Sequence, residues 1–317
     1  MWEEERDAWR AGAGTVLRLA VAELRLLLRR PRLRYDVVLV GYPGHFDLPA
    51  ARRAARGAPV VFDPLVSLAD TLVSDRGRFR PRSVPARFLE AVDRRALRAA
   101  DVVVADTRAH ARFLAALAGL DRVEVCYVGA EERLFRPAPE PPAFTHVLFV
   151  GKLIPLHGLD TILEAARLVP GVALRLVGDG QLRALLARRP PNVEWVPWVE
   201  YEQLPDEYRA AGAALGVFGR SEKAARVIPN KAFHALACGV PLVTADTPAA
   251  RELLADGVSA LLVPPGDSER LAEALGRLAA DDALRSRLRA GGLAAYREHA
   301  SEEVLARRWR EIVERAR

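Results

Sequence analysis

The chain has few of the residues that mark several classes of protein. It contains only two cysteines, Cys126 and Cys238, which excludes a disulfide framework and favours a reducing cytoplasm. No uncharged apolar run of about 18 residues occurs, so no membrane span is expected. The N-terminus is acidic and polar, unlike a secretory or transit leader. The formal charge of +6 is mild for the length, and nucleic acid is therefore not an expected partner.

Lysine is nearly missing as well. Only Lys152, Lys223 and Lys231 are lysines among the 47 basic residues, and all three lie between residues 152 and 231. A GC-rich genome accounts for the bias towards arginine, but it leaves open why these three remain. Lysine carries a compact, movable charge and arginine a wide planar fork. One hypothesis is that the three positions require a compact ammonium group.

Short apolar segments alternate with helical patterns along the whole chain, which is typical of α/β proteins. Apolar, β-branched runs predict buried parallel strands at residues 37–41, 59–62, 101–105, 123–128, 146–150, 173–177, 193–197, 214–218, 241–245 and 260–263. Helical periodicity predicts helices at residues 84–99, 159–169, 181–188, 203–211, 229–238, 249–254, 268–281, 283–299 and 302–317.

A proline-rich segment divides this alternation into two doubly wound, Rossmann-like domains. We predict a first domain at 1–136, a hinge at 137–144, a second domain at 145–299 and a C-terminal helix, 300–317, that packs back towards the first domain. In open α/β sheets, ligands bind beyond the carboxyl ends of the strands. We therefore expect the functional residues to follow strand ends and to line a cleft between the domains.

Glycines and basic residues follow two strands of the second domain. Gly151, Lys152 and His157 precede a helix whose N-terminus favours anions, although a tight turn with a solvated lysine explains the same pattern. Gly178 and Gly180 flank an aspartate and permit close approach of a ligand to the backbone. The aspartate is equally suited to cap the next helix.

A loop of mixed charge follows the predicted strand at 214–218. Three cations lie within nine residues and close to a helix that begins near a proline, an arrangement suited to a diphosphate. A solvated basic loop is the alternative. The residues of interest are Glu222, Lys223, Arg226, Pro229, Asn230 and Lys231.

The run IPNKAFHALACGVPLVTADTPAARELLADGVSALLVPPGD, at 228–267, resembles the donor-binding half of family 4 (group 1) glycosyltransferases of the GT-B fold. GKLIPLHGLDTILEAA (151–166) and LRLVGDG (174–180) fit the same family in order and spacing. Upstream, YDVVLVGYPGHFDLPAARRAA, VVFDPLVSLADTLVSDR and LRAADVVVADTRAH resemble its acceptor domain. The first domain has about four predicted strands, fewer than a full half, so we expect it to be an incomplete acceptor domain that lacks an N-terminal portion.

The resemblance implies retaining transfer of a sugar from a nucleotide diphosphate sugar to an acceptor hydroxyl, in polysaccharide or glycolipid synthesis at the cell surface. It places Lys152 and His157, and also Arg226, Asn230 and Lys231, at the diphosphate and sugar. It places Val196 at the nucleotide base and His45 near the reacting carbon. Cations on the leaving group stabilise the charge that develops in the transition state. No DxD-type acidic pair follows a strand, so neither a metal nor a resident cofactor is expected.

One departure from the family concerns the residue expected to bind the ribose hydroxyls. Family members carry two glutamates around the IPNK helix, and the second of these, which binds ribose, is replaced by His234. An imidazole accepts fewer hydrogen bonds than a carboxylate, so weaker donor binding or a substitute role for Glu222 is expected. A non-catalytic nucleotide-sugar-binding or partner subunit is therefore an alternative function. Another GT-B enzyme, such as a nucleotide-sugar epimerase, is a third.

The basic, amphipathic segment 15–34 suits either a core-packed helix or a helix that lies on anionic lipid. The second interpretation predicts peripheral contact with the inner face of the membrane and fits a lipid-linked acceptor.

Overall fold

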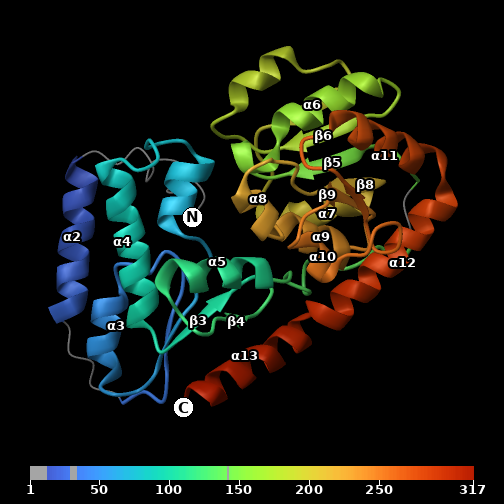
Figure 1. Ribbon diagram of the computed structural model, residues 1–317. Coiled ribbons are helices and arrows are strands. Elements are labelled where there is room, and N and C mark those ends of the chain that lie inside the picture. The colour runs from blue at the N-terminus through green and yellow to red at the C-terminus, as the bar shows by residue number, and fades with distance from the viewer. Residues whose placement is uncertain (1–12, 29–33, 141–142) are drawn as a thin grey trace.

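The computed structural model describes residues 13–28, 34–140 and 143–317. Two separate parallel sheets form the cores of two α/β domains (Figure 1). The strands are β1 Val38–Val40, β2 Val60–Phe62, β3 Val102–Ala105, β4 Glu124–Val125, β5 Val147–Val150, β6 Leu174–Val177, β7 Val193–Val196, β8 Ala213–Leu215, β9 Leu242–Ala245 and β10 Leu261–Val263.

The helices of the first domain are α2 Ala13–Leu28, α3 Leu48–Ala55, η1 Asp70–Asp75, α4 Val84–Ala99 and α5 Arg108–Ala118. The second half contains η2 Pro155–His157, α6 Leu159–Leu168, η3 Arg183–Arg188, η4 Tyr201–Gln203, α7 Leu204–Ala210, α8 Glu222–Arg226, α9 Asn230–Ala237, α10 Ala250–Leu253, α11 Ser268–Ala280, α12 Asp282–His299 and α13 Glu302–Ala316.

The ten predicted strands are confirmed, although the one expected at 123–128 is reduced to Glu124–Val125, and one helix type and one further strand boundary are corrected. Arg183–Arg188 forms a 3-10 helix instead of an α-helix. β8 ends at Leu215 instead of residue 218. The backbone of Phe218 and Gly219 donates to the carbonyls of His157 and Leu156, at 3.2 Å each, and so joins a neighbouring loop instead of extending the strand. Of the helical segment expected before residue 34, α2 is described, and the remainder lies outside the described residues.

The second sheet has the strand order β10-β9-β8-β5-β6-β7, in which the direction of winding reverses between β5 and β8. Its strands are buried because helices cover both faces. Along β5, Val147 and Phe149 pack against the helices α6 and α11, whereas Leu148 packs on the opposite face with α9. Ligands bind at such a reversal point, beyond the carboxyl ends of the strands. The sheet topology therefore directs attention to the loops that follow β5 and β8.

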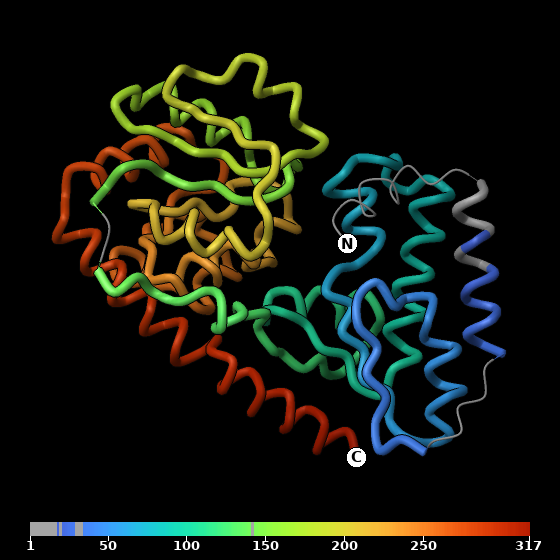
Figure 2. The backbone as a smooth tube through the Cα atoms, turned by 180° about the vertical axis from the view of Figure 1, so that it is seen from behind, coloured from blue at the N-terminus to red at the C-terminus, as the bar shows by residue number. Residues whose placement is uncertain are grey.

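The first sheet has the order β1-β2-β3-β4, and its two faces are covered by elements from opposite ends of the chain. Val60 and Phe62 pack against α3, α4 and α5. Val61 and Val104 pack against Ile312 of α13, which is fully buried. Figures 1 and 2 show α13 running from the second domain back along the first. The C-terminal helix thus completes the core of the first domain.

α2 lies on the outside of the first domain, beside α3 (Figure 1). Its side chains Val21, Leu24 and Leu28 are exposed, and they share one face because they recur at spacings of three and four residues. Arg18 and Arg25 are exposed as well. Within residues 13–28, 34–140 and 143–317, no helix combines the length and apolarity needed to cross a membrane.

Candidate functional site

The loop after β5 hydrogen bonds to the loop after β8 at the reversal point of the second sheet, and two glycines let it pack closely on the loop after β6. Gly151 and Gly178 have φ of +152° and +137°, which L-residues rarely adopt. A Cβ on Gly178 would lie 2.0 Å from the carbonyl oxygen of Gly151, and one on Gly151 would lie 2.7 Å from Nζ of Lys231. Gly180 packs in a similar way against the backbone of Leu153. The three predicted glycines therefore lie together, next to Lys231.

Lys231 is the most unusual charge of this region. The residue is 6% exposed, and among the described residues its Nζ has no hydrogen-bond partner. The centroid of the Phe149 ring lies 4.1 Å from Nζ. Burial without an acidic neighbour holds the pKa of Lys231 well below its usual value. An anion that entered beside Gly151 would supply the missing counter-charge.

His157 lies in the loop that follows β5, and its imidazole ring carries no charge. Its Nδ1 donates a hydrogen bond of 2.5 Å to the carbonyl of Lys152, since a carbonyl only accepts. Burial, and secondarily Lys231, lowers the pKa of His157 well below its usual value. Nε2 of the neutral ring is consequently an acceptor. The family resemblance predicts that His157 contacts the diphosphate as a basic residue. For His157 to act there as a cation, the arriving anion must raise its pKa.

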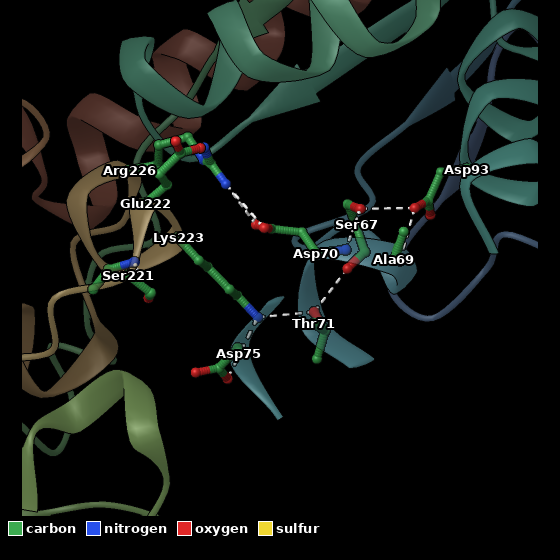
Figure 3. Close-up of polar contacts among 11 residues, drawn as sticks. Ser67, Ala69, Asp70, Thr71, Asp75, Asp93, Ser221, Glu222, Lys223 and Arg226 are labelled. Atoms are coloured by element: carbon green, nitrogen blue, oxygen red, sulfur yellow. Dashed lines mark hydrogen bonds and ion pairs between the residues drawn. The ribbon is translucent and has the colours of Figure 1, made fainter. Parts of the chain in front are cut away.

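The basic side chains of α8 point towards the first domain (Figure 3). Arg226 donates from Nη2 to both carboxylate oxygens of Asp70, at 2.9 Å each, and its guanidinium lies 4.0 Å from the ring centroid of Phe113. Lys223 donates to Oγ1 of Thr71 at 2.8 Å and lies 3.9 Å from Asp75. The structure thus places these two predicted donor ligands in the interdomain contact.

The other predicted donor residues surround this region at its edges. The Glu222 side chain is 93% exposed and pairs with Arg226 at 3.2 Å. Pro229 and Asn230 begin α9, immediately before Lys231. The carbonyl of Val196, at the end of β7, accepts from the backbone N–H of Gly178 at 2.9 Å. Pro229 and Asn230 are thus next to Lys231 in sequence, Val196 contacts Gly178, and Glu222 lies at the exposed surface of α8.

His234 lies in an aromatic cluster. Its ring stacks on Phe135 at 3.9 Å with an interplanar angle of 7°, and it meets Tyr201 and Tyr208 edge to face. Burial, with Lys231 as a smaller cause, lowers the pKa of His234 to about 4. At neutral pH the ring is therefore uncharged. It packs as an aromatic side chain in place of the carboxylate that the family resemblance predicts.

His45 does not lie where the sequence-based prediction put it. Its side chain is 1% exposed, with Nε2 3.3 Å from the fully buried Asp93. Its ring also packs edge to face on Phe62, at 5.2 Å. A side chain closed off in this way does not touch a sugar, so the assignment of His45 to the reacting carbon is corrected. It belongs to the internal support of the first domain.

The sequence analysis did not identify several charged residues of the first domain. Asp63 and Asp106 directly follow β2 and β3, and Asp106 pairs with His110 at 2.6 Å. Applying the strand-end rule to the first domain would have found the two aspartates, but not His110, which lies in α5. Burial raises the pKa of Asp63. Asp70 and Asp75 occupy the π-helix η1, whose irregular geometry produces no periodicity in the sequence.

No group of three or more His, Cys, Asp or Glu side chains that could hold a metal ion occurs within the described ranges. A cavity of about 860 Å³ opens at the amino ends of β5, β6 and β7, the edge opposite Lys231. Arg175 on its wall is already held by Glu207 and Glu194, at 2.7 and 2.5 Å. This cavity contributes nothing to the site at the carboxyl ends.

Comparison with known proteins agrees with this two-domain arrangement. Residues 5–131 match the family described as glycosyl transferase 4-like domain, and residues 145–281 match glycosyl transferases group 1. A D-inositol 3-phosphate glycosyltransferase of Nocardioides sp. is 30% identical over 324 residues, covering 89% of this chain and 69% of the relative. The chain belongs to the group 1 glycosyltransferases.

Other members of the family are longer than this chain. A D-inositol 3-phosphate glycosyltransferase of Xylanimonas cellulosilytica is 32% identical over 66% of the chain and 55% of its own length. The lipopolysaccharide core biosynthesis glycosyltransferase LpsE of Rhizobium meliloti is 31% identical over 49% of the chain and 44% of its own length. The chain therefore spans about half the length of these two relatives.

Solved structures share the GT-B fold. Sucrose-phosphate synthase from Thermosynechococcus elongatus superposes with a TM-score of 0.74 at 19% identity, over 89% of this chain and 73% of the other. Anabaena Alr3699/HepE, in complex with UDP and glucose, gives 0.68 at 20% identity, over 88% and 78%. The predicted fold class of two Rossmann-like domains is confirmed.

Proposed function

We propose that this chain transfers a sugar from a nucleotide diphosphate sugar to an acceptor hydroxyl, with retention of anomeric configuration. The second domain binds the donor and the first binds the acceptor. The observation that carries the proposal is the buried amine of Lys231, which has no acidic partner in the part of the chain that the structure describes and lies against Gly151 at the reversal point of the sheet. The family membership and the UDP complex of a structural neighbour support the choice of ligand.

The chemistry follows from charge at the leaving group. Cleavage of the sugar–phosphate bond leaves negative charge on the diphosphate and positive charge on the sugar. A fixed ammonium beside the diphosphate stabilises this separation more than it stabilises the intact donor. In the buried surroundings of Lys231 that effect is larger than in water. The proposal requires neither a metal ion nor a resident cofactor.

A donor panel tests the proposal most directly. Purified chain is incubated with UDP-, GDP- and ADP-linked sugars and candidate acceptors, and the products are identified by mass spectrometry. NMR of the anomeric proton then reports retention or inversion. We expect one donor to yield free nucleoside diphosphate and a glycosylated acceptor. Release of nucleotide without any sugar transfer, for every donor and acceptor, would count against a transferase.

The second candidate function is a binding subunit without catalysis. It is favoured by the neutral state of His157 and by the aromatic packing of His234, which together reduce the polar donor contacts. Isothermal titration with the same nucleotide sugars separates the two candidates. A binding subunit holds a nucleotide sugar and leaves it intact in the presence of acceptor. A nucleotide-sugar epimerase would instead convert the donor without acceptor.

We also propose that the acceptor is a glycolipid or polysaccharide precursor and that the chain acts at the inner face of the membrane. The exposed apolar and basic side chains of α2 support contact with anionic lipid. The involvement of LpsE in lipopolysaccharide core synthesis supports the acceptor class. Co-sedimentation with anionic vesicles should be lost in Leu24→Glu and in high salt. Equal sedimentation with uncharged vesicles would contradict the electrostatic part of this proposal.

A further inference from the structure

The contact between the two domains contains buried charges contributed by each side. η1 of the first domain supplies Asp70, Thr71 and Asp75, whose residues are 8%, 6% and 5% exposed. α8 of the second domain supplies Lys223, at 7%, and Arg226, whose side chain is 15% exposed. We call these five residues the interdomain clamp (Figure 3). Breaking one partner of such a pair leaves the other charge buried and unpaired, which is far more costly than losing a surface ion pair.

The first-domain side of the clamp is anchored to its own core. Fully buried Asp93 of α4 accepts hydrogen bonds from the hydroxyl of Ser67, at 2.7 Å, and from the backbone N–H groups of Leu68 and Ala69, at 2.8 and 2.9 Å. The hydroxyl of Thr71 in turn donates to the Ser67 carbonyl at 2.7 Å. These bonds fix η1 relative to α4, so the acidic side chains are presented from a rigid base.

The second-domain side of the clamp is continuous with the candidate donor site. Only Val227, Ile228 and Pro229 separate α8 from α9, which carries Lys231 in its first turn. The carbonyl of Arg226 also accepts a hydrogen bond of 2.5 Å from the hydroxyl of Thr107 in the first domain. Both the side chain and the backbone of Arg226 are therefore held by the first domain. A shift of α8 would move the start of α9.

The cations of the clamp are already engaged. Both oxygens of Asp70 receive Nη2 of Arg226, and Nζ of Lys223 is directed at Thr71 and Asp75. Lys231, by contrast, has no acidic partner within the described part of the chain. The three cations that lie within nine residues of the sequence thus form two sets: Lys223 and Arg226 contact the first domain, whereas Lys231 does not pair with an acid in the described part of the chain.

We propose that Asp70, Thr71 and Asp75 are positioning residues, which hold Lys223 and Arg226 so that the two domains keep the relative orientation in which Lys231 faces the donor and the first domain faces the sugar. The effect on turnover rests on the proposed sugar transfer, whereas the effect on domain orientation does not. Lys223 and Arg226 then contribute little to binding the diphosphate itself.

The experiment measures domain orientation and diphosphate binding separately. Spin labels are attached to cysteines introduced at the exposed positions Arg53 and Arg277, one in each domain, and their distance distribution is measured by pulsed electron resonance. The native thiols, Cys126 and Cys238, are both buried, and burial raises the pKa of Cys126 to about 11, so they resist labelling. Affinity is measured by titration with pyrophosphate, which contains no base, and with UDP.

Asp70→Asn should lengthen and broaden the interdomain distance while leaving the affinity for pyrophosphate within about two-fold. Turnover should fall about ten- to hundred-fold, as expected when reacting groups are misplaced by about 1 Å. The exchanged pair Asp70→Arg with Arg226→Asp should recover both distance and turnover. Thr71→Val keeps every charge of the clamp and removes the two hydrogen bonds of the Thr71 hydroxyl, from Lys223 and to the Ser67 carbonyl, so it provides a milder variant should Asp70→Asn not fold.

Glu273→Gln is the matched control, because it breaks an exposed ion pair with Arg270 on α11, away from the interface. It should change neither distance nor affinity. An unchanged distance distribution in both Asp70→Asn and Thr71→Val would overturn the clamp, whatever the activity. A loss of pyrophosphate affinity in Arg226→Asp with Asp70→Arg as large as that in Lys231→Met would show that Arg226 binds the diphosphate, and would overturn it equally. If no donor is turned over, the distance and affinity measurements still decide.

Discussion

Replacing Lys231 with methionine should stabilise the protein and weaken its binding of the donor. Methionine keeps the length of the side chain and removes the amine, which is buried and without a hydrogen-bond partner among the residues described. An unsatisfied polar group in a protein interior costs about 1–3 kcal/mol. The free energy of unfolding should therefore rise by about this amount. The melting temperature should rise by about 2–4 °C for each kcal/mol.

The pH dependence of this gain follows from the lowered pKa of Lys231. Between that value and the usual 10.5, the unfolded chain holds a proton that the folded chain lacks. The wild type should therefore gain stability as pH rises across this window. Lys231→Met lacks this contribution, so its advantage over the wild type should be largest at the low end of the window and shrink towards pH 10.5.

Binding should respond in the opposite sense. A charge-assisted hydrogen bond to phosphate contributes about 1.5–3 kcal/mol, so Lys231→Met should weaken binding of UDP about 10- to 150-fold. In the wild type, the bound diphosphate favours the ammonium form, so binding should take up a proton. Titration calorimetry in two buffers of different ionisation enthalpy measures that uptake, which the methionine variant should lack.

Lys231→Arg serves as the companion variant. It retains a charge, but the wide guanidinium must fit where Nζ already lies 4.1 Å from the Phe149 ring centroid and close to Gly151. Binding should be impaired here too. A methionine variant that is less stable than the wild type, or that binds UDP equally well, would refute the assignment of Lys231 to the diphosphate.

Three further substitutions test the fold around this site. Gly178→Ala places a Cβ 2.0 Å from the carbonyl oxygen of Gly151, so it should cost about 1–3 kcal/mol of stability and abolish UDP binding, whereas Gly171→Ala, which has open space around it, should do neither. Ile312→Ala should destabilise the first domain by about 2–5 kcal/mol in denaturant unfolding, because Ile312 is fully buried against the first sheet; a loss confined to the second domain would contradict this. His234→Phe keeps the aromatic packing and removes a group whose pKa is about 4 in the folded chain and 6.5 when unperturbed. Because of this group, the wild type should lose up to about 3 kcal/mol of its free energy of unfolding as pH falls from 6.5 to 4, and the variant should not show this loss. Identical acid unfolding of both proteins would argue against the buried neutral ring.

The sequence predicted the strands and the glycines of the donor side because both leave local patterns. Buried parallel strands are continuous apolar runs, and Gly151 and Gly178 follow such runs directly. Lys231 was found in the same way, from its place at the start of a helix after proline. The local pattern did not predict the environment of the Lys231 amine. That the amine is buried, with no acidic neighbour among the residues that the structure describes, depends on Phe149 and on loops distant in sequence.

Contacts that need a partner from the other domain could not be read from the sequence. Lys223 and Arg226 have the composition of a phosphate-binding loop, and nothing local distinguishes a cation that meets phosphate from one that meets aspartate. The distinction is made by Asp70, which lies 156 residues from Arg226 in the chain. His45 failed for a related reason, since its burial depends on Asp93 of a later helix.

The rarity of lysine can now be given a more specific physical meaning. Lys223 and Lys231 are both almost fully buried, yet Lys223 contacts Thr71 and Asp75 of the first domain, whereas the amine of Lys231 has no hydrogen-bond partner among the described residues. A compact ammonium suits both places, because a buried position admits a single nitrogen more easily than a planar fork. The shared residue type therefore reflects shared confinement, and the difference in function comes from the charge opposite. Where the first domain supplies the anion, the lysine joins two domains; where the described residues supply none, the proposed donor provides it.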